Sequence, residues 1–97
     1  MINSFELSRK ASIEILDSWV WYEEQRDGLG DLFKDEVHAK IKFILRHPEL
    51  YAITGKYRQA PLDTFPFLIL YQIRETQSRI LIVSIFHTSR HPKKKTR

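Results

Sequence analysis

Histidine is the side chain of this sequence best suited to acid–base chemistry, because its imidazole gains and loses a proton near neutral pH. Of the four histidines, His87 stands out because it ends an apolar run that predicts a strand. The same position also suits a histidine that only closes a strand at a sheet edge, so both interpretations stay open. The histidines lack metal-ligand spacing and the chain has no cysteine, so we expect no metal ion and no cofactor.

Positive charge is concentrated at the C-terminal end of the sequence. Five of the sixteen basic side chains lie in the last eight residues: Arg90, Lys93, Lys94, Lys95 and Arg97. The other eleven are balanced by twelve acidic side chains in residues 1–89, so the body is close to neutral. Clustered lysine and arginine are typical of nucleic-acid contacts, so we expect these five residues to bind nucleic acid or a target. The alternative is a solvated terminus without a partner.

The length and composition predict one small intracellular domain. A chain of 97 residues with 42% hydrophobic residues can form a single packed core. We expect this domain to span residues 1–90 and a basic tail to follow at 91–97. The N-terminus lacks the basic start and apolar run of a signal peptide, and the longest apolar runs are too short for a bilayer. We therefore expect a cytoplasmic protein without membrane contact.

Two helices are expected near the start of the chain. A short strand at 2–7 is followed by Ser8, a favourable N-cap residue, and by a helix over 9–26. The apolar stripe of this helix recurs at helical spacing: Ala11, Ile15, Trp19 and Tyr22. Two glycines then favour a tight turn, and a second amphipathic helix over 30–46 ends before a proline. Two such helices with a short connection predict an antiparallel αα-hairpin.

The rest of the sequence predicts a three-stranded antiparallel meander. Its strands are expected at 57–60, 65–74 and 79–87, with a polar turn between the last two. Alternation places one set of aliphatic residues on the sheet face away from the helices: Leu68, Leu70, Leu81, Val83 and Ile85. A monomer rarely leaves such a face open, so either a partner or a loop or tail of this chain should cover it. The expected fold class is α+β, with the helices packed on one face of a twisted sheet.

Several segments resemble toxins of the RelE/ParE superfamily, in the same order along the chain. They are residues 21–25, 28–33, 47–51, 56–60, 65–67, 70–73 and 85–92. Together they cover nearly the whole chain, and they are closer to ParE-like members of this plasmid stabilisation family than to RelE. The resemblance implies the fold described above and a bacterial toxin of a type II toxin–antitoxin system. It also implies a cognate antitoxin that wraps the toxin, and the five aliphatic residues are its expected contact surface.

The first target that the resemblance implies is messenger RNA. RelE-type members cut it in the ribosome without a metal, which requires a base, an acid and cations that stabilise the phosphorane. The candidate catalytic residues that match here are Lys56, Arg58, His87 and Arg90. A structural alternative for Arg58 is an ion pair with Glu36 or Asp63.

The second implied target is DNA gyrase, which ParE-type members poison without a hydrolytic site of their own. Two departures from the RelE pattern favour this target. Leu68 stands where an arginine would open the third strand, and no tyrosine follows His87. The loss of one preorganised donor can cost about 3–4 kcal/mol in a transition state. We therefore expect a gyrase poison rather than an enzyme, with ribosome-dependent RNA cleavage as the alternative.

Overall fold

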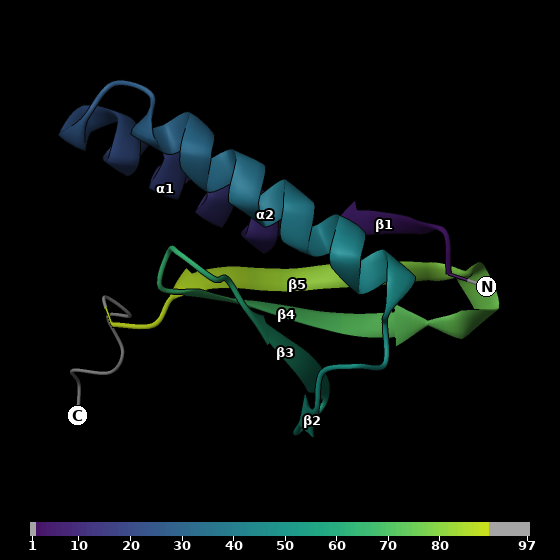
Figure 1. Ribbon diagram of the computed structural model, residues 1–97. Coiled ribbons are helices and arrows are strands. Elements are labelled where there is room, and N and C mark those ends of the chain that lie inside the picture. Colours follow the sequence, from purple (N-terminus) through teal and green to yellow (C-terminus); the bar gives the residue numbers. More distant parts are fainter. Residues whose placement is uncertain (1, 90–97) are drawn as a thin grey trace.

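A computed structural model describes residues 2–89 of the chain. A first strand is followed by two helices and then by four further strands (Figure 1). The elements are β1 Ser4–Leu7, α1 Arg9–Gln25, α2 Leu29–Arg46, β2 Ile53–Thr54, β3 Tyr57–Pro61, β4 Phe67–Arg74, a 3-10 helix at Glu75–Gln77, and β5 Arg79–His87. The predicted helices and strands are confirmed to within two residues at each end. The sequence does not predict the short strand β2, and the predicted polar turn before β5 forms the 3-10 helix.

Ser8 begins α1 and also ties the helix to the sheet. Its hydroxyl oxygen accepts a hydrogen bond from the backbone N–H of Ala11 at 3.0 Å, as expected of an N-cap residue. The same hydroxyl donates to the carbonyl of Val83 at 2.8 Å, and the Ser8 N–H donates to the carbonyl of Ile82. The first turn of α1 is therefore fixed against β5 at the point where β1 ends.

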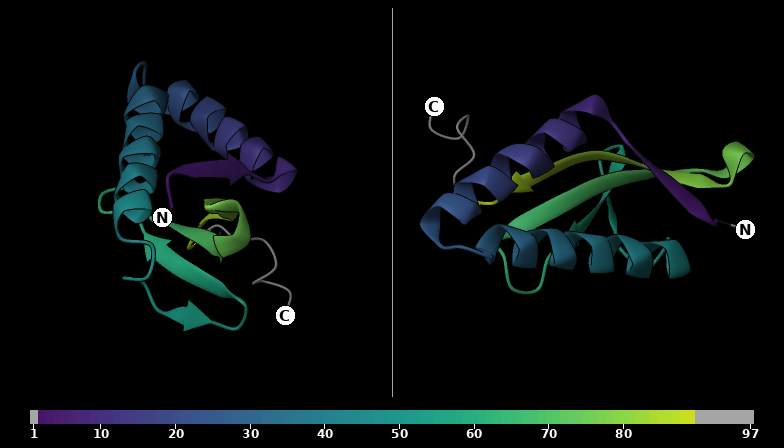
Figure 2. Two further views of the ribbon diagram at one scale, coloured as in Figure 1. Left: turned by 90° about the vertical axis from the view of Figure 1, so that its right-hand side faces the viewer. Right: turned by 90° about the horizontal axis from the view of Figure 1, so that it is seen from above.

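The strands form one mixed sheet in the order β1-β5-β4-β3-β2. Strands β3, β4 and β5 are the predicted antiparallel meander, whereas β1 pairs with β5 in parallel, with Phe5 opposite Ile80. Parallel neighbours need a long crossover, and the helical hairpin is part of the connection here. Both helices lie on the same face of the sheet (Figures 1 and 2), so the expected α+β architecture is confirmed.

A bulge in β5 changes which side chains of the sheet face the helices. Val83 is an extra residue between Ile82 and Ser84, which oppose consecutive residues of β4. Beyond the bulge the alternation is displaced by one residue, and Ile85 lies in the core at 1% exposure, opposite Ile69. The prediction that Ile85 lies on the face away from the helices is therefore wrong, because strict alternation does not allow for an extra residue.

The core fills the space between α2 and the sheet. The largest fully buried side chains come from α2 and from the last two strands: Phe33, Ile44, Phe67, Ile69, Tyr71, Ile80, Ile82 and Ile85. Phe33 packs against Phe67 with their ring centroids 4.7 Å apart, and Tyr22 packs edge-on against Phe65 at 4.9 Å. Aromatic pairs of this kind add to the stabilisation from buried area. Trp19, which the stripe on α1 predicts as core, is only half-buried.

The edge of β5 beyond β1 is capped by a carboxylate from α1. One oxygen of Glu14 accepts hydrogen bonds from the Ser84 hydroxyl and from the Ile85 N–H, both at 2.8 Å. The ammonium group of Lys10 lies 3.4 Å from the other oxygen. A strand edge presents unpaired backbone donors, and Glu14 satisfies one of them with a charge-assisted bond. Glu14 and Ser8 together determine where α1 lies on the sheet.

Candidate functional site

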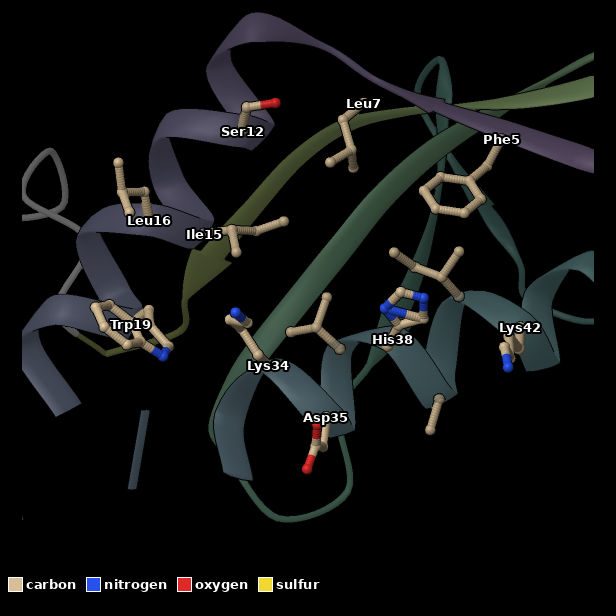
Figure 3. Close-up of a pocket in the computed structure, with 13 residues that line it drawn as sticks. Phe5, Leu7, Ser12, Ile15, Leu16, Trp19, Lys34, Asp35, His38 and Lys42 are labelled. Atoms are coloured by element: carbon tan, nitrogen blue, oxygen red, sulfur yellow. The ribbon is translucent and has the colours of Figure 1, made fainter. Parts of the chain in front are cut away.

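An apolar groove lies between the two helices. They diverge from the turn that joins them (Figure 2) and leave a groove of about 880 Å³, with β1 at its base. Figure 3 shows side chains lining it from all three elements: Ile15, Leu16 and Trp19 of α1, Phe5 and Leu7 of β1, and His38 of α2. Lys34 and Lys42 add positive charge at its border. Such a surface can bury the apolar face of a peptide or helix.

The closed end of the groove depends on a close approach of the helices at Gly30. A Cβ at this buried residue would lie 2.6 Å from the carbonyl oxygen of Trp19. The Glu23 carboxylate accepts hydrogen bonds from the N–H groups of Gly28 at 3.1 Å and Gly30 at 2.8 Å, so it caps α2 from α1. The Trp19 indole N–H donates to Asp31 at 3.0 Å. These contacts hold the helices together at one end, and the groove opens beyond them.

A cationic cleft lies at the other side of the molecule, where β2, β3 and β4 meet. It has a volume of about 480 Å³, and Lys56, Arg58 and Arg74 line it. Glu49 and Glu75 also line the cleft and offset part of this charge. The structure therefore brings together two of the predicted nuclease residues, Lys56 and Arg58. It adds Arg74, which the sequence does not single out.

Two side chains of the cleft hold the segment after α2. Arg58 donates to the carbonyl of Tyr51 at 2.7 Å and to that of Glu49 at 3.4 Å. Its strand partner Tyr71 donates its hydroxyl to the carbonyl of Pro48 at 2.8 Å. Burial raises the pKa of Tyr71 to about 12, although the nearby Arg58 guanidinium acts in the opposite direction. Tyr71 is therefore a neutral donor at physiological pH, and this pair acts as a clamp on residues 48–51.

Neither carboxylate suggested as a partner for Arg58 binds it. Asp63 lies 3.5 Å from the ammonium group of Lys40, and Glu36 accepts a hydrogen bond from a backbone N–H in the loop before β4. Lys40 also donates to the Tyr51 hydroxyl at 3.3 Å. Burial lowers the pKa of Lys40, but the bond to Tyr51 and the attraction of Asp63 raise it above its usual value. These carboxylates therefore join α2 to the loops around β3.

His87 lies at one end of the β4–β5 pair, away from the clamp, which lies near the middle of β4. Tyr71 of β4 is opposite Arg58, whereas Phe67, four residues earlier, is opposite His87. At about 3.3 Å per residue the separation along β4 is about 13 Å. The His87 ring packs edge-on against Phe67 with centroids 5.2 Å apart, and its Nδ1 accepts a hydrogen bond from the Ser89 N–H. The fold does not bring His87 to the cationic cleft.

The sheet face away from the helices is less open than the sequence predicts. Leu68, Leu70, Leu81 and Val83 are each half-buried. Beyond the bulge Phe86 lies opposite Leu68, in the place predicted for Ile85. The large apolar side chains with the greatest exposure lie mainly on α1 and around β2 instead.

The predicted basic residues at the C-terminal end lie outside the part of the chain that the structure describes. Arg90 and the tail residues Lys93, Lys94, Lys95 and Arg97 lie outside the described part of the chain, so their role in binding stays a prediction. Within residues 2–89, no group of three histidine, aspartate or glutamate side chains is placed to share a metal ion. No helix in the same range is long and apolar enough to cross a membrane.

The groove is not among the surfaces predicted from the sequence. Its signal is the breadth of the apolar stripe on α1, where Leu16 and Val20 extend the face formed by Ala11 and Ile15. An apolar stripe too wide to be covered by the sheet alone indicates that α1 has a second apolar contact. The distance between the helices cannot be read from this pattern, because it depends on the approach at Gly30.

Comparison with solved structures supports the fold. The chromosomal ParDE toxin–antitoxin system of P. aeruginosa superposes with a TM-score of 0.76 at 14% identity, covering 90% of this chain and 96% of that chain. The RelBE toxin–antitoxin complex of E. coli gives 0.65 at 16% identity, with coverages of 89% and 96%. The isolated E. coli RelE toxin gives 0.63 at 15% identity, with coverages of 93% and 88%. These likenesses concern the fold alone.

Comparison at the level of sequence families is more specific. None of the curated proteins matches this chain. Residues 5–92, however, match the family described as "ParE toxin of type II toxin-antitoxin system, parDE". The match spans both helices, four whole strands and all of β1 except Ser4, and it confirms the resemblance inferred from the sequence segments. The chain therefore belongs to the ParE toxin family of type II toxin–antitoxin systems.

Proposed function

We propose that this chain is the toxin of a type II pair, that it arrests bacterial growth by poisoning DNA gyrase, and that a cognate antitoxin neutralises it. Membership of the ParE family supports this proposal. The observation that carries the choice of gyrase over RNA is the separation of His87 from Lys56 and Arg58.

Metal-free RNA cleavage needs its acid, base and cations around one phosphate, each within hydrogen-bond reach. A spacing of about 13 Å along β4 separates the positions of His87 and Arg58, so a shared phosphate would require both side chains to extend toward each other. The Arg58 guanidinium is also bound to backbone carbonyls, so transfer to a phosphate would break the clamp. Leu68, opposite Pro61 and Phe86, supplies no cation. This arrangement supports a toxin that acts by binding.

The groove between the helices supports an antitoxin partner. Its apolar lining and its length along both helices suit one face of an amphipathic segment. Apolar area contributes about 25 cal/mol per Å² removed from water, so even 300–400 Å², as an order of magnitude, offsets much of the cost of ordering a flexible segment. The half-buried leucines of the open sheet face offer a second, smaller contact.

Induced expression in bacteria tests the target. A gyrase poison should trigger the DNA-damage response soon after induction, and messenger RNA ends should match those of uninduced cells. Co-expression of the protein encoded beside this chain should abolish the response. Growth arrest without DNA damage, together with new messenger ends inside translated codons, would contradict the proposal.

Ribosome-dependent RNA cleavage is the second candidate, and the cationic cleft is the observation that favours it. Lys56, Arg58 and Arg74 line one cavity, and cations of this kind can hold a phosphate. In that case the double variant Lys56→Gln/Arg74→Gln should lose both RNA cleavage and toxicity. Neither side chain takes part in the clamp, so the variant should still fold.

A further inference from the structure

The solvent-facing side of α1 carries a line of large apolar side chains that lie exposed in the described part of the chain. Ile13, Leu16 and Val20 are exposed to 49%, 59% and 40%. Their spacing of three and then four residues places them on one face of the helix. Ala11 and Tyr22, the buried residues of α1, lie on the opposite face. Helix α1 itself lies at the periphery of the molecule (Figure 2).

Opposite charges stand at the two ends of this line. Arg9 precedes Ile13 by four residues, and Glu24 follows Val20 by four residues. Both are exposed, and within residues 2–89 neither joins an ion pair. The positions of Arg9, Ile13, Val20 and Glu24 are symmetric about a point between Leu16 and Asp17, except that the charge changes sign.

These charges do not serve the helix itself. A helix favours acidic side chains in its first turn and basic ones in its last turn. Helix α1 has no acidic residue in its first turn and no basic residue in its last turn. Arg9 and Glu24 therefore sit at the ends of α1 that the helix dipole disfavours, so the dipole does not account for their positions.

We propose that this face of α1, formed by Arg9, Ile13, Leu16, Val20 and Glu24, binds the same face of a second copy of the chain. A two-fold axis through the middle of α1 makes the two helices antiparallel. Arg9 then lies opposite Glu24 of the second copy, and Ile13 lies opposite Val20 of the second copy. This one arrangement matches both end charges and the apolar pair Ile13–Val20, and symmetry repeats each contact.

The interface is small, so the dimer is expected to be reversible. From residue 9 to residue 24 the helix extends about 22 Å, at 1.5 Å per residue. Two helices in contact over that length bury less than about 1,200 Å², the range of transient complexes. Asp17 is the symmetry counterpart of Leu16, so its carboxylate lies against Leu16 of the second copy. The variant Asp17→Asn should therefore strengthen association by removing a charge from an apolar contact.

Sedimentation equilibrium of the full chain tests the proposal. The wild type should pass from a mass of 11.6 kDa to twice that value as its concentration rises from about 10 µM to about 1 mM. Arg9→Glu and Glu24→Arg should each weaken association at least tenfold, because each places like charges together at both ends. The double variant should regain wild-type association to within about threefold. Each of these three variants places a charge at an end of α1 that the helix dipole favours, so all three should still fold.

Control variants separate this interface from others. Lys42→Glu reverses a charge on α2, away from the proposed contact, and should leave the mass unchanged. Ile13→Glu should make the protein monomeric throughout the concentration range. A wild type that stays monomeric at about 1 mM would overturn the proposal and leave the line to an antitoxin or a target. A dimer whose association is unchanged in both Arg9→Glu and Glu24→Arg would overturn the proposal as well.

Discussion

The groove between the helices and the cationic cleft at β2–β4 are concave surfaces built in opposite ways. The groove is lined mainly by apolar side chains, several of them half-buried or exposed, such as Trp19 and Leu16. The cleft is lined by charged and polar groups, and its central pair, Arg58 and Tyr71, already binds backbone carbonyls of residues 48–51. The groove has contact area that the fold leaves unused, whereas the cleft uses its polar groups to hold a loop.

This difference shows that a cluster of cations is not by itself a reactive site. Arg58 matches a catalytic position by sequence, yet its nearest partners are the carbonyls of Tyr51 and Glu49. A guanidinium that replaces lost hydrogen bonds in a loop stabilises the fold. The groove shows the converse. Its apolar side chains stay partly exposed to water in the monomer, and a partner that covers them would bury this surface.

The groove can be blocked without disturbing the fold. Ala39 is an exposed residue of α2 that lines it, and Ala39→Glu would place a carboxylate against an apolar partner segment. We expect binding of the antitoxin to weaken at least a hundredfold, about 2.8 kcal/mol, when measured by calorimetry. Ala52→Glu, at an exposed position outside the groove, is the matched control. Equal affinities for the two variants would show that the antitoxin binds elsewhere.

The angle between the helices can be changed at Gly30. Gly30→Ala places a Cβ 2.6 Å from the Trp19 carbonyl oxygen, which is backbone and cannot rotate away. We expect a loss of about 1–3 kcal/mol in the free energy of unfolding, measured with urea. Gly55→Ala is a useful comparison, because Gly55 has a positive φ of 69° but no neighbour within 4 Å. It should cost only about 1 kcal/mol, and equal losses would argue against a close helix contact.

The clamp can be opened by Tyr71→Phe, which removes the hydrogen bond to the Pro48 carbonyl. We expect a loss of about 1 kcal/mol at neutral pH. Folding raises the pKa of Tyr71 from 10.0 to about 12, so its contribution is complete below pH 10 and is lost as pH rises through 12. Over that range the wild type should lose up to about 1.4 kcal/mol per pH unit more than the variant. Tyr57→Phe is the control. If the free energy of unfolding of Tyr71→Phe changed with pH in parallel to that of the wild type, Tyr71 would not be a buried donor.

The charge of the cleft can be lowered without touching the clamp. Lys56 is exposed and lies in the turn between β2 and β3. If the toxin poisons gyrase, the double variant Lys56→Gln/His87→Ala should change the toxicity of the induced protein less than twofold. Both side chains are candidates only for RNA cleavage, which a gyrase poison does not need. Growth curves after induction measure this. A loss of toxicity in a variant with normal stability would restore the nuclease interpretation.

The sequence predicts the elements well because their signals are local. Ser8 starts a helix by capping it, and the polar turn before Arg79 ends a strand. It fails where a feature depends on a distant contact. The bulge at Val83 occurs where Ser8 and Glu14 bind the edge of β5, and the extra residue moves Ile85 into the core. Alternation along one strand carries no information about such a contact.

The candidate site is predicted only in part, for the same reason. Lys56 and Arg58 are close in sequence, so their proximity follows from any strand or turn there. His87 belongs to a strand that pairs with β4, and only the register shows that it lies opposite Phe67 rather than Tyr71. The groove depends on Gly30 and Glu23, whose contact with α1 requires the hairpin to be folded.

The most direct measurement is DNA supercoiling by purified gyrase in the presence of the purified chain. A toxin that acts by binding should block supercoiling of relaxed plasmid and cause cleaved DNA to accumulate, and the Lys56→Gln/His87→Ala variant should do the same. Addition of the antitoxin should restore supercoiling. Full gyrase activity at saturating toxin, alongside cleavage of messenger RNA on translating ribosomes, would contradict the account.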